Sequence, residues 1–140
     1  MTPGYALRRY QKNKRELALI EASLARLNMQ LKEVPIVSGK VMKSGDDFPY
    51  IEEHISVEMA EPNEAERIRG KISRKEARRK AVVQEMAEAE GFIEEMPEGI
   101  GRQILEMVFL DGMTQQEVGE SIGYTQARVS QIVKSAAEDL

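Results

Sequence analysis

The sequence GRQILEMVFLDGMTQQEVGESIGYTQARVSQIVKSAAEDL, residues 101–140, decides how the rest of this chain is interpreted. Its apolar residues recur at helical spacing in three short runs, which predicts three helices. The first predicted helix covers residues 102–110. It ends at Asp111 and Gly112, because glycine readily adopts the left-handed conformation that closes a helix.

The second and third predicted helices are separated by a tight turn. Thr114 opens the second helix with a capping box, in which its hydroxyl accepts the backbone N–H of Glu117 and the Glu117 carboxylate accepts the N–H of Thr114. Gly123 stops that helix, and Thr125 caps the third. A short helix, a turn that contains glycine and a second helix together form a helix-turn-helix.

The start of the third helix carries polar side chains suited to DNA. In DNA-binding helix-turn-helices, the first residues of the second helix of the motif enter the major groove. The candidate DNA-binding residues of the recognition helix, residues 125–140, are Thr125, Gln126, Arg128, Ser130, Gln131 and Lys134. Glutamine pairs with adenine through two hydrogen bonds, and arginine pairs with guanine or phosphate. The alternative is a three-helix bundle with a solvated outer face; we favour DNA binding.

The segment TQQEVGESIGYTQARVSQIVKSAAEDL, residues 114–140, resembles region 4 of sigma-70-type RNA polymerase sigma factors. The shared features are the T-x-x-E-V-G opening, the Gly-x-Thr turn, and the V-x-Q-I run followed by small residues and a final leucine. The resemblance implies promoter bases as contacts of Gln126, Ser130 and Gln131, and RNA polymerase as a second partner. The family usually has arginine where this chain has Gln126 and Ser130.

The layout of the whole chain is similar to that of small phage regulators of the ArpU and RinA type. The shared parts are an N-terminal coil, the intervening segment FPYIEEHISVE at residues 48–58, a second charged coil and the region-4-like end. This second resemblance implies a phage or prophage regulator that switches on late genes.

The N-terminal residues 5–34 carry a heptad pattern typical of a coiled-coil helix. The residues of its apolar seam are Tyr10, Asn13, Leu17, Ile20, Leu24, Leu27, Leu31 and Val34. Asn13 is the polar member. It either selects the register or the oligomeric state, or it lies at a frayed end. Pro35 ends the helix.

The middle of the chain predicts a small β-hairpin followed by a second long helix. Apolar and polar residues alternate over residues 50–59, which indicates a strand paired with residues 36–42. Asn63 then caps a helix that runs to about residue 95. Lys75 and Arg79 interrupt the apolar seam of this helix, beside a basic run at residues 74–80. Pro97 and Gly99 mark the step into the C-terminal domain.

These elements predict a mainly α protein. Two long coiled-coil-type helices are joined by a small β-hairpin insertion at about residues 36–60 and are followed by a C-terminal helix-turn-helix domain. The predicted domains are therefore residues 1–97 and residues 98–140. The two apolar seams must pack either against each other or against a second chain, and we expect a homo-oligomer formed through the long helices.

Composition excludes several classes of function. The chain has no cysteine and one histidine, and it lacks a nucleophile motif, a phosphate-binding loop and a metal-ligand cluster, so we expect no enzyme activity, no cofactor and no metal. No apolar run is long enough to span a membrane and the N-terminus lacks a signal-peptide core, so we expect a soluble, cytoplasmic protein. Residues 98–140 hold three basic and seven acidic residues, which predicts weak DNA binding by this domain alone.

Three functional hypotheses follow. The first is a sequence-specific regulator that binds double-stranded DNA through residues 125–134 and contacts RNA polymerase. The second is a DNA-packaging or assembly protein, similar to a small terminase subunit, in which the helix-turn-helix is structural or binds DNA non-specifically. The third is an anti-activator that contacts polymerase and not DNA.

Overall fold

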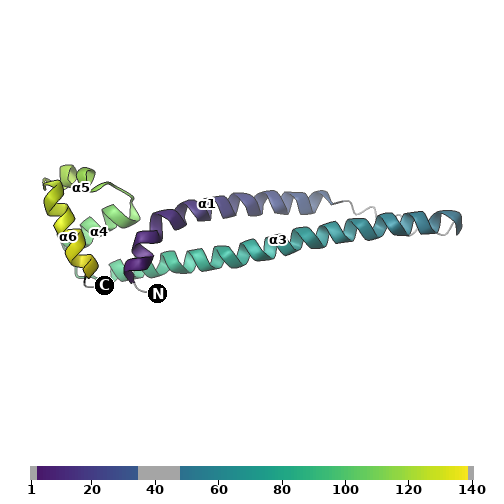
Figure 1. The fold of residues 1–140 in the computed structure, drawn as a ribbon, viewed down its shortest axis with the longest axis horizontal. Coiled ribbons are helices and arrows are strands. Elements are labelled where there is room, and N and C mark those ends of the chain that lie inside the picture. The colour runs from purple at the N-terminus through teal and green to yellow at the C-terminus, as the bar shows by residue number, and fades with distance from the viewer. Residues whose placement is uncertain (1–2, 35–47, 139–140) are drawn as a thin grey trace. The chain divides into compact units, whose positions relative to one another are not determined.

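The computed structural model describes residues 3–34 and 48–138, with the backbone alone described for residues 3, 48–62, 137 and 138. Its elements, shown in Figure 1, are the α-helices α1 (Pro3–Glu33), α3 (Phe48–Glu94), α4 (Ile100–Leu105), α5 (Gln115–Ile122) and α6 (Gln126–Glu138) and the π-helix η1 (Glu106–Leu110). The predicted mainly α architecture, with two long helices and a C-terminal helix-turn-helix, is confirmed.

The predicted β-hairpin at about residues 36–60 is wrong. The described residues contain no strand, and residues 50–59, predicted as a strand, lie inside α3. The predicted partner strand, residues 36–42, falls outside the described residues. The alternating pattern misled because Ile51, Ile55 and Met59 are also spaced by four residues, which is the period of a helix face.

The chain divides into two compact units, each described here by itself. Unit 1 consists of Met1–Ala18 and Lys80–Leu140, and unit 2 consists of Leu19–Arg79. In each unit, parts of α1 and α3 run side by side in opposite directions (Figure 1). The predicted boundary between residues 97 and 98 stays a prediction.

Unit 2 is held together by one apolar seam. Among the side chains described in this unit, the buried apolar ones are Ile20, Leu27, Ala65 and Ile68. The guanidinium of Arg79 lies 3.7 Å from the Glu21 carboxylate across the helix pair, with both side chains about half exposed. Such an exposed ion pair adds little stability, so the seam carries most of the packing energy of this unit.

Unit 1 has a single core to which all of its α-helices contribute. The first turns of α1 supply Ala6, Leu7 and Tyr10, and the end of α3 supplies Ala89 and Ile93. The other members come from the C-terminal helices and are Ile104, Leu105, Val118, Val129 and Val133. The helix-turn-helix therefore does not build its core alone but shares it with both long helices.

A polar cluster lies where α1 meets α3 in unit 1. The Arg9 Nε donates to the Glu85 carboxylate at 2.7 Å, and the Asn13 side-chain amide donates to the same oxygen at 3.0 Å. Asn13 is 1% exposed, and within the described residues its Oδ1 accepts no hydrogen bond. Asn13 is thus a buried polar member of the seam, not the frayed end that was the alternative.

Tyr10 extends this cluster. Its hydroxyl donates to the Glu90 carboxylate at 3.0 Å. Burial, together with the hydrogen bond and negative charge of Glu90, raises the pKa of Tyr10 to about 12. The remaining seam positions of α1 are all buried or half-buried, as the heptad pattern predicts.

Candidate nucleic-acid interface

The helix that precedes the helix-turn-helix is longer than α4 alone. Residues 100–105 form α4, and the helical path continues through the π-helix η1 to Leu110, where the N–H of Asp111 donates to the carbonyl of Glu106 at 2.9 Å. This agrees with the predicted helix over residues 102–110. Gly112 follows with a φ of 73°, the left-handed conformation that was expected to close it.

A side chain from α1 fixes the end of η1. The Gln11 amide donates to the carbonyls of Phe109 and Leu110, at 3.0 and 2.7 Å. These carbonyls lie at a helix terminus, where they have no partner within the helix and need one from elsewhere. A β-carbon at Gly112 would lie 2.8 Å from Oε1 of Gln11, so the glycine also makes room for this contact.

The start of α5 is fixed by the predicted capping box. The Thr114 hydroxyl accepts the N–H of Glu117 at 3.1 Å, and the Glu117 carboxylate accepts the N–H of Thr114 at 3.0 Å. The hydrogen bonds from the backbone and then the side chain of Thr114 lower the pKa of Glu117. Val118, one turn into α5, is fully buried and holds the helix on the core.

The turn between α5 and α6 depends on two glycines. Gly123 has a φ of 79° and ends α5 in the left-handed conformation. The carbonyl of Gly119 accepts the N–H groups of Gly123 and Tyr124, at 2.8 and 2.9 Å. A β-carbon at Gly119 would lie 2.5 Å from the carbonyl oxygen of Tyr124, so the backbone of the turn comes too close to α5 for any side chain there.

The helix α6 starts at Gln126 with Thr125 before it. The Thr125 hydroxyl accepts the N–H of Arg128 at 3.1 Å, which satisfies one of the free donors at the helix start. Val129 and Val133 are buried in the core, while Ile132 is half-buried. The apolar stripe of α6 is thereby turned inward, as the sequence predicts.

The opposite side of α6 presents most of the predicted DNA-binding residues to solvent. Thr125, Gln126, Arg128, Gln131 and Lys134 are exposed. Ser130 is half-buried and is therefore the least accessible of the predicted set.

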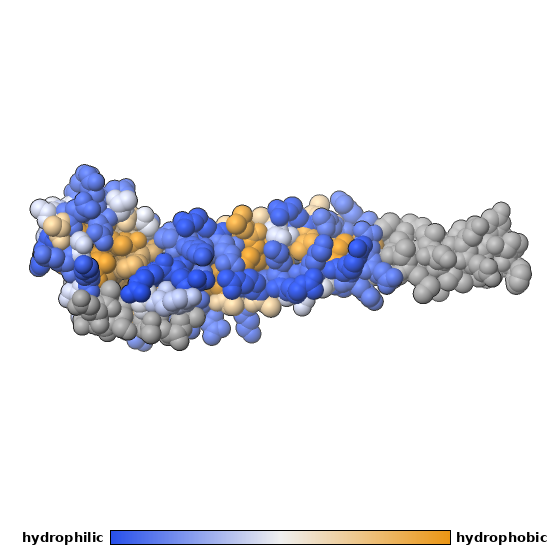
Figure 2. Space-filling view, in the orientation of Figure 1, coloured by the Kyte–Doolittle hydropathy of each residue, from blue (hydrophilic) through white to orange (hydrophobic). Residues whose placement is uncertain are grey.

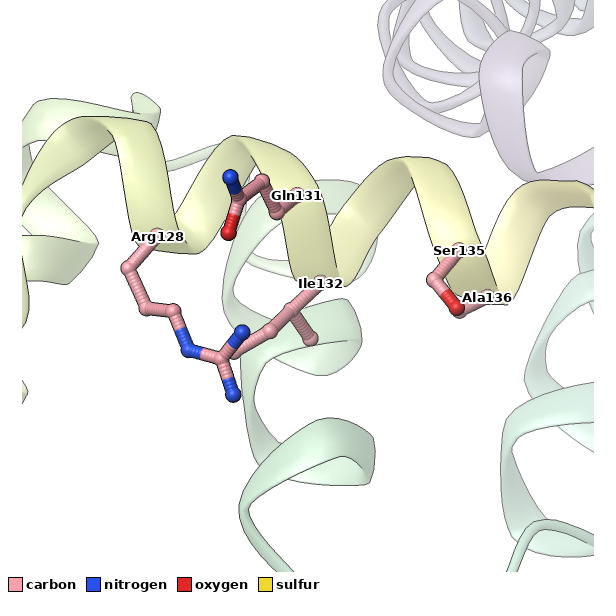
Figure 3. Close-up of a pocket in the computed structure, with 5 residues that line it drawn as sticks. All are labelled: Arg128, Gln131, Ile132, Ser135 and Ala136. Carbon is pink, nitrogen blue, oxygen red and sulfur yellow. The ribbon is translucent and has the colours of Figure 1, made fainter.

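Figure 3 shows how part of this surface is arranged. Arg128, Gln131, Ile132, Ser135 and Ala136 line one pocket along α6. The Arg128 side chain runs past Ile132, one turn along the helix, while Gln131 leaves the helix on another side. Because Arg128 is exposed, its guanidinium can reach an anionic partner such as a phosphate.

Other kinds of site find little support in the part of the chain that the structure describes. Among the side chains that the structure describes, no three or more metal-ligating residues lie close enough together to hold a metal ion. Among the same residues, no helix is both long and apolar enough to cross a membrane.

Gln11 contributes to this region but was not among the residues predicted from the sequence. No local pattern points to it, since the carbonyls that it binds lie 98 and 99 residues away. Gly119 was noted only as part of the T-x-x-E-V-G opening. That motif is the available indication of the close contact, because only glycine fits against the Tyr124 carbonyl.

Comparison with known proteins agrees with the geometry of this segment. Residues 100–140 match the family model described as Sigma-70, region 4. Comparisons with the curated proteins and with the solved structures found no match to the chain. The predicted layout resemblance to ArpU- and RinA-type regulators is therefore not shown. The helix-turn-helix formed by α5 and α6 therefore lies in a segment that is similar to region 4 of sigma-70.

Proposed function

We propose that this chain is a sequence-specific DNA-binding transcriptional regulator of phage or prophage type. The observation that carries the proposal is the region 4 match over residues 100–140, on a helix-turn-helix whose α6 exposes polar side chains. The structure buries the apolar stripe of α6 in unit 1 and leaves its opposite side available to a duplex. In this motif, that side of the second helix enters the major groove.

Four exposed polar residues of α6 have a role in this proposal. Gln126 and Gln131 read bases, since a glutamine amide donates to and accepts from adenine in the major groove. Arg128 contacts guanine or a phosphate, and Lys134 contacts a phosphate. Ser130, being half-buried, contributes at most a hydroxyl at the edge of the contact.

Two further partners belong to the proposal. RNA polymerase is one, because the match is to a region of sigma-70. A second copy of the chain is the other, since two linked DNA-binding domains that each bind weakly gain avidity when both bind one duplex. A DNA-binding role also fits the cytoplasmic location that the sequence predicts.

A DNA-packaging or assembly protein is the alternative. The feature that favours it is a helix-turn-helix attached to long helices, which a small terminase-like ring would use for assembly. The two functions differ in solution mass and in sequence preference. A large cyclic oligomer without a preferred duplex supports packaging, whereas a small oligomer with a preferred half-site supports regulation.

The test is selection of bound duplexes from a random library by the full-length protein, followed by titration of the enriched duplex. A double variant, Gln126→Ala with Gln131→Ala, is expected to lose the preference for that duplex over a shuffled one. The expected loss is about 1–3 kcal/mol of discrimination for each glutamine that pairs with a base.

The matched control is Gln84→Ala with Gln103→Ala, which removes two exposed glutamines from α3 and α4. This control is expected to keep the preference and the helix content of the parent. If the α6 double variant discriminates as well as the parent does, α6 is not the recognition helix.

A further inference from the structure

The densest group of cations in the chain lies on α3, outside the segment that matches region 4. Residues 67–80 hold eight basic residues and a single acidic one, Glu76. All eight basic side chains are exposed. Between residues 85 and 95 the same helix carries five acidic residues and no basic one. Positive charge is thus concentrated in one part of α3, which belongs almost entirely to unit 2.

Four of these residues form a stripe along the helix. Arg67, Lys71 and Arg74 are spaced by four and three residues, which places them on one side of α3, and Lys75 lies one turn beyond Lys71. We call these four residues the basic stripe; it spans about 12 Å at the rise of an α-helix. Arg79 is not a member, because it is paired with Glu21 of α1.

Small residues lie beside the stripe. Gly70, Ser73 and Ala77 alternate with its cations along α3. The guanidinium of Arg74 reaches back over Gly70, with Nη1 3.5 Å from the place where a β-carbon would be. A helix-interior glycine costs about 0.5–1 kcal/mol relative to alanine, and it lets a ligand approach the backbone closely. This side of α3 therefore combines basic side chains with small neighbouring residues, which leave room for a ligand to approach.

The surface around the long helices is consistent with a solvated, charged face. Figure 2 shows mainly hydrophilic residues over the described parts of the long helices, with separate hydrophobic patches between them. A charged face alone would be explained by solubility. We expect the basic stripe to bind a ligand because the recognition segment, residues 98–140, is itself acidic.

The helix-turn-helix segment is poorly supplied with cations. Residues 98–140 hold three basic and seven acidic residues, yet DNA affinity depends largely on neutralised phosphates. We infer that the basic stripe binds the phosphate backbone of double-stranded DNA and supplies the sequence-independent affinity that the recognition segment lacks. This inference rests on the proposed function for its choice of partner, since an acidic protein would also suit the charge.

The test compares the salt dependence of DNA binding between two full-length variants of equal net charge. The stripe variant is Arg67→Gln, Lys71→Gln, Arg74→Gln and Lys75→Gln. The control is Lys12→Gln, Lys14→Gln, Arg26→Gln and Lys32→Gln, which removes four exposed cations from α1. Glutamine keeps helix propensity close to that of lysine and arginine, so circular dichroism should match the parent in both variants.

Fluorescence anisotropy with a selected and a shuffled duplex, from about 50 to about 200 mM salt, gives the slope of log K against log salt. The stripe variant is expected to lower the magnitude of this slope by about three to four, because each phosphate contact contributes about 0.9. Its affinity should fall about tenfold or more at low salt, on both duplexes alike. Lys71→Gln alone should lower the slope by about one, which guards against a fold defect in the quadruple variant.

The outcomes separate this inference from the proposed function. If the parent protein prefers neither duplex but the salt slope still falls in the stripe variant, the proposed regulator is rejected and the phosphate contact of the basic stripe is supported. If the stripe variant keeps both the preference for the selected duplex and the salt slope of the parent, the inference about the basic stripe is overturned and the proposed regulator is supported. An equal fall in the α1 control also overturns the inference, because bulk charge then explains the effect. So does binding of the stripe to an acidic protein with no effect on DNA.

Discussion

The two units of this chain differ in how their helices pack against one another. In unit 1, five α-helices bury residues in one cluster, and hydrogen bonds such as those from Gln11 join segments far apart in sequence. In unit 2, the described side chains of α1 and α3 bury one seam, and the outer side of α3 is occupied by cations.

The two units therefore differ in how much packing a substitution disturbs. A side chain in the core of unit 1 contacts several helices, so a change there disturbs the support of α6. The described cations at residues 67–79 of unit 2 are exposed, so this part of α3 carries a dense run of charge at little cost in packing. Unit 1 is therefore suited to hold a fixed recognition surface, and unit 2 to carry an electrostatic one.

The largest expected effect contrasts a leucine from each unit. Leu7→Ala, at a side chain 1% exposed in the shared core, should lower the free energy of unfolding by about 2–5 kcal/mol. Leu27→Ala, at 8% exposure in the seam of unit 2, should cost an amount near the lower end of that range. Leu7→Ala should also speed amide hydrogen exchange in α6, while Leu27→Ala should leave that exchange nearly unchanged.

Leu19→Ala is the control for this pair. Its side chain is 71% exposed on α1, so the substitution should change stability by no more than about 0.5 kcal/mol. Should Leu27→Ala loosen α6 as much as Leu7→Ala does, the two units would behave as one cooperative body and the contrast between them would disappear.

The parts of the fold that sequence could predict are those that depend on near neighbours. The capping box of Thr114 and Glu117 and the left-handed Gly123 each act within a few residues, so their patterns fixed α5 and the start of α6. The heptad seam of α1 was likewise predictable, because period alone determines which side of a helix is apolar. Five of the six candidate DNA-binding residues are exposed, and their contacts with bases stay a prediction.

The parts that sequence could not predict depend on distance or on competing patterns. Residues 50–59 fit both a strand and a helix. Asn63 was predicted to cap the second long helix, but α3 begins at Phe48 and passes through Asn63, so the predicted start was wrong. No sequence pattern near Gln11 indicates its hydrogen bond to the end of η1. Oligomerisation and the polymerase contact stay predictions because each concerns a partner beyond this chain. The phage origin also stays a prediction.

The next largest effect concerns the tight turn that presents α6. Gly119→Ala would place a β-carbon 2.5 Å from the Tyr124 carbonyl, and because that atom belongs to the backbone, relief requires the turn to move. We expect a loss of about 1–3 kcal/mol in thermal or denaturant unfolding, together with weaker DNA binding. Gly91→Ala is the matched control, since a β-carbon there meets nothing within 4 Å, and it should stabilise the chain by about 0.4–1 kcal/mol. Equal effects from the two substitutions would show that the close approach at the turn is not a constraint.

The smallest effect tests the polar contact between α1 and α3 in unit 1. Tyr10→Phe removes the hydrogen bond to Glu90 and should lower the free energy of unfolding by about 1 kcal/mol near neutral pH. The pKa of Tyr10 is about 12 in the folded chain, against 10.0 ordinarily, so the unfolded chain loses this proton first as the pH rises. The stability due to the tyrosine is thus complete below pH 10 and declines between pH 10 and about 12. Denaturant titrations of both proteins at a series of alkaline pH values should show the advantage of the parent shrinking over this interval. A constant difference would mean that the Tyr10 hydroxyl titrates as it does in the unfolded chain, and that burial at this end of unit 1 is weaker than its packing indicates.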